Sequence, residues 1–419
     1  MSYLIQRLSY GFLVLLGVVF LVFTLFSLVP DPARELAGQN ESPEVIEAIR
    51  KKHRLDLPYF PRLGYFLNDL SPISYNSTIE GEASFIDLNS ISELRLFEGE
   101  GQVLILKFPY LGRSFLSDRS VSAILADALP GTAVLALAAI IIAMLFGIAL
   151  GVLTALNKDT WIDHLTMVLA SLGMSGPSFF MAILIAWFGG TLIYDQVLIP
   201  IWPIVFVLLF FGLKKYWAGA KQFSLIRENS FLIGLLSGLA VWFVLIALKV
   251  PGGIMYLRLP GTGLSATGSL YEVDVWEGKK LSLVNLILPA ITLGIRPLAV
   301  IIQLTRSSLL EVMQEDYIRT AYAKGLSRQQ VIWKHAIRNA LNPVITAASG
   351  WFASMLAGAV FVEFVFGWKG IGFEVFQALE KNDLPVVMGA VLVIASTFVI
   401  INILVDLIYG WLDPRARVV

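Results

Sequence analysis

Hydrophobic residues gather in long runs along this chain. Six runs of about 20 residues or more cover roughly 9–29, 131–156, 162–194, 285–306, 343–366 and 385–411. Each is long enough to cross the hydrocarbon core of a bilayer as a helix. Two further apolar runs lie at 197–213 and 231–248. The pattern predicts an all-α polytopic membrane protein with six spans, or eight if the last two runs also cross.

Helix-breaking residues interrupt two of these runs. Gly173, Gly176 and Pro177 lie within the third run, and Pro289 and Pro297 within the fourth. Because proline lacks an amide donor and clashes with the preceding turn, each proline predicts a kink or a break. Pro130 precedes the second run, so we expect that helix to begin near residue 131.

Polar residues dominate the long stretch 30–122 that follows the first run. Ser42 and Pro43 predict the start of a helix that continues to about His53. Alternation from Val103 to Phe108 predicts a short strand. The first run is longer than a signal-peptide core, and no small-residue cleavage site follows it, so we interpret it as an uncleaved span.

A charged segment from Glu311 to Val344 separates the fourth and fifth runs. Ser327 and Gln330 have the spacing of a capping box, which predicts a helix start. Gly325 suits a left-handed turn at the end of the preceding helix. Asn342 and Pro343 predict the start of the next apolar helix. We therefore expect two helices that meet at Gly325.

Lysine and arginine in the short loops predict the orientation. Residues 214–229 carry four of them and 307–342 carry five, whereas 367–383 carries two. Because basic loops stay in the cytoplasm, both termini and the segment 307–342 are expected there.

Composition excludes several classes of function. Hydrophobic residues make up 57% of the chain, charged residues 15%, and the formal net charge is zero, so no broad attraction to nucleic acid is expected. There is no cysteine, and the three histidines lie in different predicted regions, so we expect no metal site and no catalytic group. No GxxxxGK[ST] loop occurs, so any ATP-driven process requires a separate nucleotide-binding subunit.

Several motifs together resemble a known family. They are Asp316-Tyr-Ile-Arg-Thr-Ala-Tyr-Ala-Lys-Gly-Leu-Ser327, Arg338-Asn-Ala-Leu-Asn-Pro343, Leu28-Val-Pro-Asp-Pro32, Leu111-Gly-Arg-Ser-Phe115, Pro177-Ser-Phe179, Leu288-Pro289, Val362-Glu-Phe-Val-Phe-Gly-Trp368, and Val405-Asp with Leu412-Asp-Pro-Arg415. The first two resemble the cytoplasmic EAA loop of ABC-importer permeases, and the whole set resembles the dipeptide/oligopeptide permease family. The family's Glu-Ala-Ala triplet aligns with Arg319-Thr320-Ala321, and its downstream Leu-Pro with Ile337-Arg338. We expect these departures from the motif to affect which ATPase subunit binds the chain rather than the class of protein to which it belongs.

The resemblance implies a type I ABC importer permease (MetI-like) core of six helices, with an inserted helical hairpin giving eight. It divides the chain into an N-terminal transmembrane helix (1–29), an extracytoplasmic block (30–122) with an insertion at about 70–110, and a transmembrane permease domain (123–419). The last includes an inserted hairpin and loop at about 196–284 and the EAA loop at 307–342. Whether 70–110 contacts a binding protein or has no function stays open.

The resemblance also implies partners and a mechanism. The partners are a second homologous permease, two ATPase subunits that use ATP and Mg, an extracytoplasmic solute-binding protein and the lipid of the inner membrane. The chain itself binds no cofactor. The residues implied in ATPase coupling are Tyr317, Arg319, Thr320, Ala321, Lys324, Gly325, Leu326, Arg328 and His335. Peptides are the first expectation for the cargo; nickel chelates, glutathione and sugars are carried by similar permeases.

Two charged residues are candidates for the pathway or its gate. Arg296 lies near the middle of its run, where an arginine costs about 2.5–3.5 kcal/mol, so it should face a wet cavity or a partner. It is either a residue of the substrate pathway, near a peptide carboxylate, or a structural residue at a local bend whose guanidinium is satisfied by a carbonyl or carboxylate of a neighbouring helix. Glu363 lies near the outer end of the fifth run and either lines a gate or anchors a helix end. A rival function, a self-contained ion-coupled carrier, would depend on Glu363 and Asp406. A membrane-embedded enzyme would need a polar cluster that the sequence lacks.

Overall fold

The structure is a computed structural model. It describes residues 2–28, 32–37, 42–79, 82, 84–85, 93–99, 101–216, 230–248, 256–274 and 278–412. The chain forms two compact units, which are treated separately below. The membrane unit comprises Met1–Ala182 and Gly268–Val419, and the insert unit comprises Ile183–Thr267.

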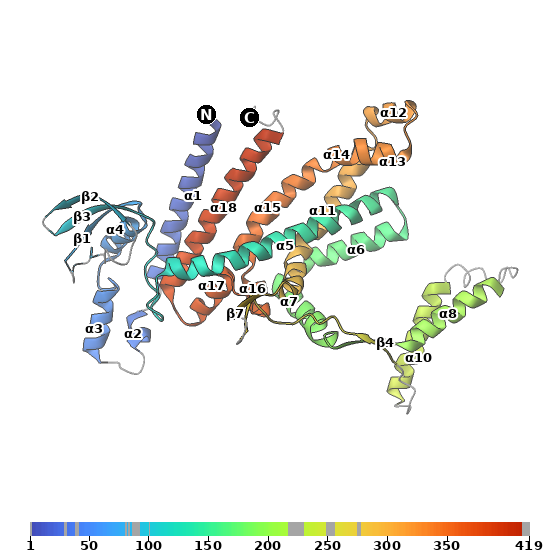
Figure 1. The fold of residues 1–419 in the computed structure, drawn as a ribbon, viewed down its shortest axis with the longest axis horizontal. Coiled ribbons are helices and arrows are strands. Elements are labelled where there is room, and N and C mark those ends of the chain that lie inside the picture. The colour runs from blue at the N-terminus through green and yellow to red at the C-terminus, as the bar shows by residue number, and fades with distance from the viewer. Residues whose placement is uncertain are drawn as a thin grey trace. The chain divides into compact units, whose positions relative to one another are not determined.

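Long apolar helices build the membrane unit (Figure 1). Four of them are long and apolar enough to cross a membrane within the described residues: α1 (Ser2–Ser27), α5 (Val121–Leu156), α11 (Val284–Val312) and α18 (Leu384–Leu412). Two bent pairs would raise the number to six. The first is α6 (Trp161–Ser175) with the segment Ser178–Leu192, which contains α7 (Ser178–Trp187), bent by 112°. The second is Asn342–Leu356 of α15 (Asn342–Gly358) with α16 (Val360–Phe366), bent by 60°. A helical, polytopic membrane protein is therefore confirmed.

The centre of the membrane unit is the close contact of α5 with α11. A Cβ atom at Gly151 would lie 2.5 Å from the Cβ of Thr305 and 2.9 Å from the carbonyl oxygen of Ile302. Only glycine allows the two backbones to approach so closely. Further along α5, the small side chains of Ala136, Ala139 and Ala143 are also buried, and they pack in one cluster with Ile301 of α11. Small residues thus draw the two longest inner helices together.

A small α/β block follows α1. It contains α2 (Pro32–Ala37), α3 (Pro43–Lys52), α4 (Tyr59–Leu70) and an antiparallel sheet in the order β1 (Ile73–Ser77), β3 (Gln102–Lys107), β2 (Glu93–Gly99). Ser42 caps α3 by accepting a hydrogen bond from the amide of Val45. The helix expected after Ser42 and the strand expected near Val103 are both confirmed.

Two boundaries differ from the sequence-based expectation. The helix α5 begins at Val121, ten residues before Gly131, because Ser120 caps it and Pro130 is accommodated inside the helix. The stretch 367–383 is not a plain loop. It contains α17 (Ile371–Glu380), whose residues Ile371 and Val375 are buried against α5 and α18.

Several short elements complete the chain. In the insert unit a π-helix (Phe188–Leu192) is followed by β4 (Gln196–Pro200), α8 (Ile201–Tyr216), α10 (Ser230–Ala247) and β5 (Tyr256–Pro260), and β4 pairs with β5. The helices α8 and α10 pack together, but their described apolar parts are shorter than a full span. Most of the predicted basic connection between them, 217–229, lies outside the described residues. In the membrane unit β6 (Tyr271–Asp274) pairs with β7 (Gly278–Leu281).

Candidate functional site

The charged segment between α11 and α15 folds into a compact set of short helices, which we call the bracket (residues 316–340). It comprises α12 (Asp316–Ala323), α13 (Arg328–Gln330), a π-helix (Val331–Ala336) and α14 (Ile337–Ala340). Gly325 has a φ of +78°, the left-handed conformation that glycine tolerates best. The capping box is present, since Gln330 accepts from the amide of Ser327 and Ser327 accepts from the amide of Gln330. The predicted pair of helices meeting at Gly325 is confirmed.

The inner face of the bracket is apolar and continuous with the membrane helices. Buried Ile318, Val331 and Ile337 share one cluster with Val152 of α5 and Leu309 of α11. Ala321 is buried in the same cluster, and Leu326 packs against it partly exposed. These contacts fasten the bracket to the ends of two long helices. The bracket and the ends of α5 and α11 therefore share one hydrophobic cluster.

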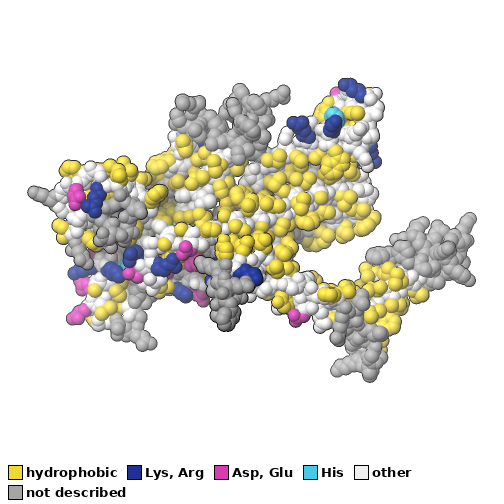
Figure 2. All heavy atoms as spheres, viewed as in Figure 1, with side chains coloured by type: hydrophobic (Ala, Val, Ile, Leu, Met, Phe, Trp, Pro, Cys, Tyr) yellow, Lys and Arg dark blue, Asp and Glu magenta, His cyan; other side chains and the backbone are white. Residues whose placement is uncertain are grey.

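The outer face of the bracket is charged (Figure 2). Arg319, Thr320, Lys324 and Arg328 are all exposed, and Arg319 lies 3.5 Å from Asp316 of its own helix. His335 is half-buried. Tyr317 is tied to α14, because the side-chain amide of Asn339 donates to its hydroxyl at 2.8 Å. Ala321 and Leu326 thus belong to the inner face, and the charged candidates to the outer one.

Trp333 is a surface residue of the bracket that sequence reasoning missed. Its side chain is 70% exposed, although Val331 and Ile332 just before it are buried. The π-helix widens the turn here and presents Trp333 beside Gln329, Gln330 and Lys334 around a shallow groove. An exposed tryptophan among polar neighbours is typical of a residue that a protein partner buries. The exposure of Trp333 depends on the π-helix, and no pattern in the sequence indicates that helix.

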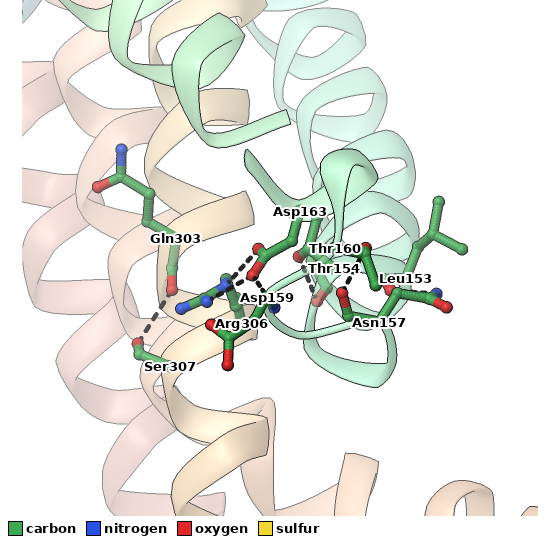
Figure 3. Close-up of polar contacts among 10 residues, drawn as sticks. Leu153, Thr154, Asn157, Asp159, Thr160, Asp163, Gln303, Arg306 and Ser307 are labelled. Atoms are coloured by element: carbon green, nitrogen blue, oxygen red, sulfur yellow. Dashed lines mark hydrogen bonds and ion pairs between the residues drawn. The ribbon is translucent and has the colours of Figure 1, made fainter. Parts of the chain in front are cut away.

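A buried ion pair joins the first turn of α6 to α11 (Figure 3). Arg306 donates from Nε and Nη2 to the two carboxylate oxygens of Asp163, both at 2.7 Å. The side chain of Asp163 is 1% exposed and that of Arg306 22% exposed. The amide of Asp159 also donates to Asp163, at 3.0 Å. Such a bidentate pair fixes both position and angle, so it locks α6 to α11 beneath the bracket.

Arg296 lines a cavity within the membrane unit. The cavity has a volume of about 130 Å³, and its other walls come from the α6–α7 break and from α15. The side chain of Arg296 is exposed, and it makes no hydrogen bond or ion pair within the part of the chain that the structure describes. The expectation of a wet cavity therefore matches its surroundings. Its role in a pathway stays a prediction.

Glu363, the second pathway candidate, is fully buried in a polar network. Its carboxylate accepts from the hydroxyl of Thr132 at 2.7 Å and from the amide of Phe373 at 3.0 Å. Thr132 in turn accepts from the amide of Ile371 at 2.8 Å. The carboxylate thus ties α16, α17 and α5 together. This geometry supports the alternative in which Glu363 anchors a helix end. The buried carboxylate also lacks the open access that a carboxylate in an ion relay needs. The side chain of Asp406 lies outside the described residues.

The prolines that were expected to kink helices have different surroundings. Pro177 lies in the break between α6 and α7, as expected. Pro289 and Pro297 lie inside α11, which is assigned as one helix, so a bend there stays a prediction. Among the described residues no group of three or more potential metal-ligating side chains lies together.

Comparison with known proteins agrees with this architecture. Residues 147–418 match the family model described as binding-protein-dependent transport system inner membrane component, and residues 1–79 match the model of its N-terminal part. The dipeptide transport system permease protein DppB of Alkalihalophilus pseudofirmus is 29% identical over 100% of this chain and 99% of its own length. DppB of Haemophilus influenzae is 36% identical over 73% of this chain and 76% of its own. The probable D,D-dipeptide transport system permease protein DdpB of Escherichia coli is 30% identical over 96% and 94%.

The apolar helices and the folded bracket are those of a multi-pass membrane protein, and the matched family model identifies its class as a membrane component of a transport system. This chain belongs to the family of binding-protein-dependent transport system inner membrane components, and it is a permease subunit of an ABC importer of the dipeptide/oligopeptide type. The family resemblance drawn from the sequence motifs is therefore confirmed.

Proposed function

We propose that this permease forms half of a translocation pathway for peptides delivered by an extracytoplasmic binding protein. The second half is a homologous permease, and two separate ATPase subunits supply the energy from ATP and Mg. The names of relatives that match nearly the whole chain support a peptide cargo, because they are dipeptide and di/tripeptide transport system permease proteins.

We further propose that the bracket is the ATPase-docking site and faces the cytoplasm with both termini. The observation that carries this is the division of the bracket into an inner face packed on α5 and α11 and an outer face bearing Arg319, Lys324, Arg328 and Trp333. Closure of the ATPases would move the bracket, and the shared apolar cluster would carry α5 and α11 with it. Six core spans are proposed, with the block after α1 outside.

Removal of Trp333 tests the docking site. A tryptophan at the centre of an interface contributes about 2 kcal/mol or more, so Trp333→Ala should weaken ATPase binding by about 30-fold. The amount of ATPase that co-purifies with the tagged permease is the measurement. Trp161→Ala is the matched control, because Trp161 is 72% exposed but lies outside the bracket. Leu326→Asp should also abolish docking, because it places a charge against the apolar cluster that holds the bracket together. If each of the single variants Trp333→Ala and Leu326→Asp co-purifies with as much ATPase as the wild type, the bracket is not the docking site.

Uptake tests the cargo separately. A strain without this gene should regain uptake of radiolabelled L-alanyl-L-alanine when the wild-type gene is restored. Uptake that does not depend on the gene would remove the peptide proposal and leave the docking site unaffected.

A further inference from the structure

The cavity around Arg296 combines elements from three parts of the membrane unit. Gly173, Gly176 and Ser178 come from the α6–α7 break, Thr292 and Arg296 from α11, and Ser354 from α15. The remaining walls are apolar, among them Trp351 and Met355. Among the described residues that line the cavity there is no aspartate or glutamate, and the guanidinium of Arg296 is the one formal charge.

Arg296 lies deep within its helix. It follows Val284, the first residue of α11, by 12 positions, which at the usual rise corresponds to about 18 Å along the helix axis. The helix continues for a further 16 residues beyond Arg296, to Val312, so the arginine lies near the middle of an apolar helix that is long enough to span a membrane. Because the described residues offer it no acceptor, the guanidinium requires water or an anion within the cavity.

The groups beside Arg296 favour an anion. A guanidinium presents a planar fork of donors that matches the two oxygens of a carboxylate. The hydroxyl groups of Ser178 and Ser354 can donate further hydrogen bonds. Ser178 is also the first residue of α7, whose first-turn amides have no acceptor within the helix and add partial positive charge. The apolar walls lower the local dielectric and strengthen each of these attractions.

We propose that this cavity is an anion subsite of the pathway, where Arg296 binds the carboxylate of the cargo during passage. The proposal deepens the peptide-transport function and rests on it, because every peptide with a free C-terminus carries such a group. A carboxylate of the second permease as the resident partner is the competing outcome of the test.

The absence of cysteine from the chain allows a direct measurement of the charge selectivity of the cavity. Ser354→Cys places a single thiol on its wall. In the assembled transporter in nanodiscs, the thiol is treated with anionic sulfonatoethyl methanethiosulfonate or with its cationic trimethylammonium counterpart, and labelling of this chain is followed by mass spectrometry. The anionic reagent should react faster. Replacing Arg296 by Gln in the same background should lower the anionic-to-cationic rate ratio by at least about fivefold, whereas Arg296→Lys should retain it.

Protection by cargo identifies the anion. L-Alanyl-L-alanine should slow the labelling of Ser354→Cys, and its C-terminal amide should not. Protection by both peptides alike would overturn carboxylate recognition. A rate ratio that is the same with Arg296 and with Gln, or a thiol that neither reagent reaches, would overturn the subsite, since a partner carboxylate or subunit then occupies it.

The outcomes separate this inference from the proposed function. If the anionic-to-cationic labelling ratio depends on Arg296, but peptides neither slow the labelling nor are taken up, the anion subsite is supported and the peptide cargo is refuted. If peptides are taken up but the labelling ratio is the same with Arg296 and with Gln at this position, the transport function is supported and the subsite is refuted.

Discussion

The ion pair between Asp163 and Arg306 should be the most sensitive polar contact near the bracket. Asp163→Asn keeps the shape of the side chain but turns one acceptor oxygen into a donor amide that faces the guanidinium. Both hydrogen bonds measure 2.7 Å, and the carboxylate is 1% exposed. Breaking a buried pair by changing one partner costs about 3–5 kcal/mol. Because Arg306 remains 22% exposed and can recruit water, we expect the lower end, about 3 kcal/mol.

A surface pair provides the matched control. Arg119 and Asp127 lie 2.8 Å apart, but their side chains are 58% and 73% exposed. Exposed pairs contribute about 0–1 kcal/mol, so Asp127→Asn should be nearly neutral. The contrast between the two Asp→Asn variants therefore isolates burial from the simple loss of a charge.

The assay is thermal inactivation of the purified transporter in nanodiscs, followed by limited proteolysis at the turn after α5. Asp163→Asn should lower the inactivation midpoint by several degrees relative to Asp127→Asn. Adding Arg306→Met to Asp163→Asn should recover part of the loss, because no unpaired charge then remains. Equal midpoints for the two single variants, or strictly additive losses in the double variant, would refute the reasoning.

Two further predictions concern residues at other sites. Glu363→Ala should destabilise the protein more than Glu363→Gln, because alanine leaves the hydroxyl of Thr132 and the amide of Phe373 without their acceptor, at about 1–3 kcal/mol each. Thermal inactivation measures this, and a transport defect without loss of stability would instead return Glu363 to the pathway. Burial, aided by Lys52, lowers the pKa of His53, whose ring packs against that of Phe115 at a tilt of 58° with ring centroids 4.4 Å apart. The folded block after α1 therefore binds fewer protons than the unfolded one, so its stability should fall as the pH drops below about 6.5. His53→Gln should flatten that dependence in hydrogen exchange, and an unchanged slope would exclude His53 as its source.

Local signals in the sequence were sufficient for the elements of the bracket. The turn at Gly325 and the capping box from Ser327 to Gln330 involve residues that are close along the chain, so their geometry follows from backbone preferences. The long apolar runs determined the spans in the same way, because bilayer thickness sets the length that a helix needs. The family motifs lie largely in these locally determined segments.

Contacts between distant residues could not be predicted. Asp163 and Arg306 are 143 positions apart, and Thr132 and Glu363 are 231 apart. The exposure of Trp333 depends on a π-helix whose extra residue shifts the buried face, and hydrophobic periodicity does not encode that shift. The predicted start of α5 near residue 131 is wrong, because the cap at Ser120 and packing further along the helix outweigh the one amide that Pro130 lacks.

By itself, the sequence determined that this chain crosses a membrane, carries no GxxxxGK[ST] loop and contains a folded bracket, since hydrophobic length, a loop motif and helix caps are all local properties. Only the tertiary structure decided what the charged residues do. It buried Glu363 in a helix anchor, paired Arg306 with Asp163, and left Arg296 facing a cavity. A charge within a bilayer must find a partner, and that partner is chosen by how the helices pack rather than by the order of residues along one of them.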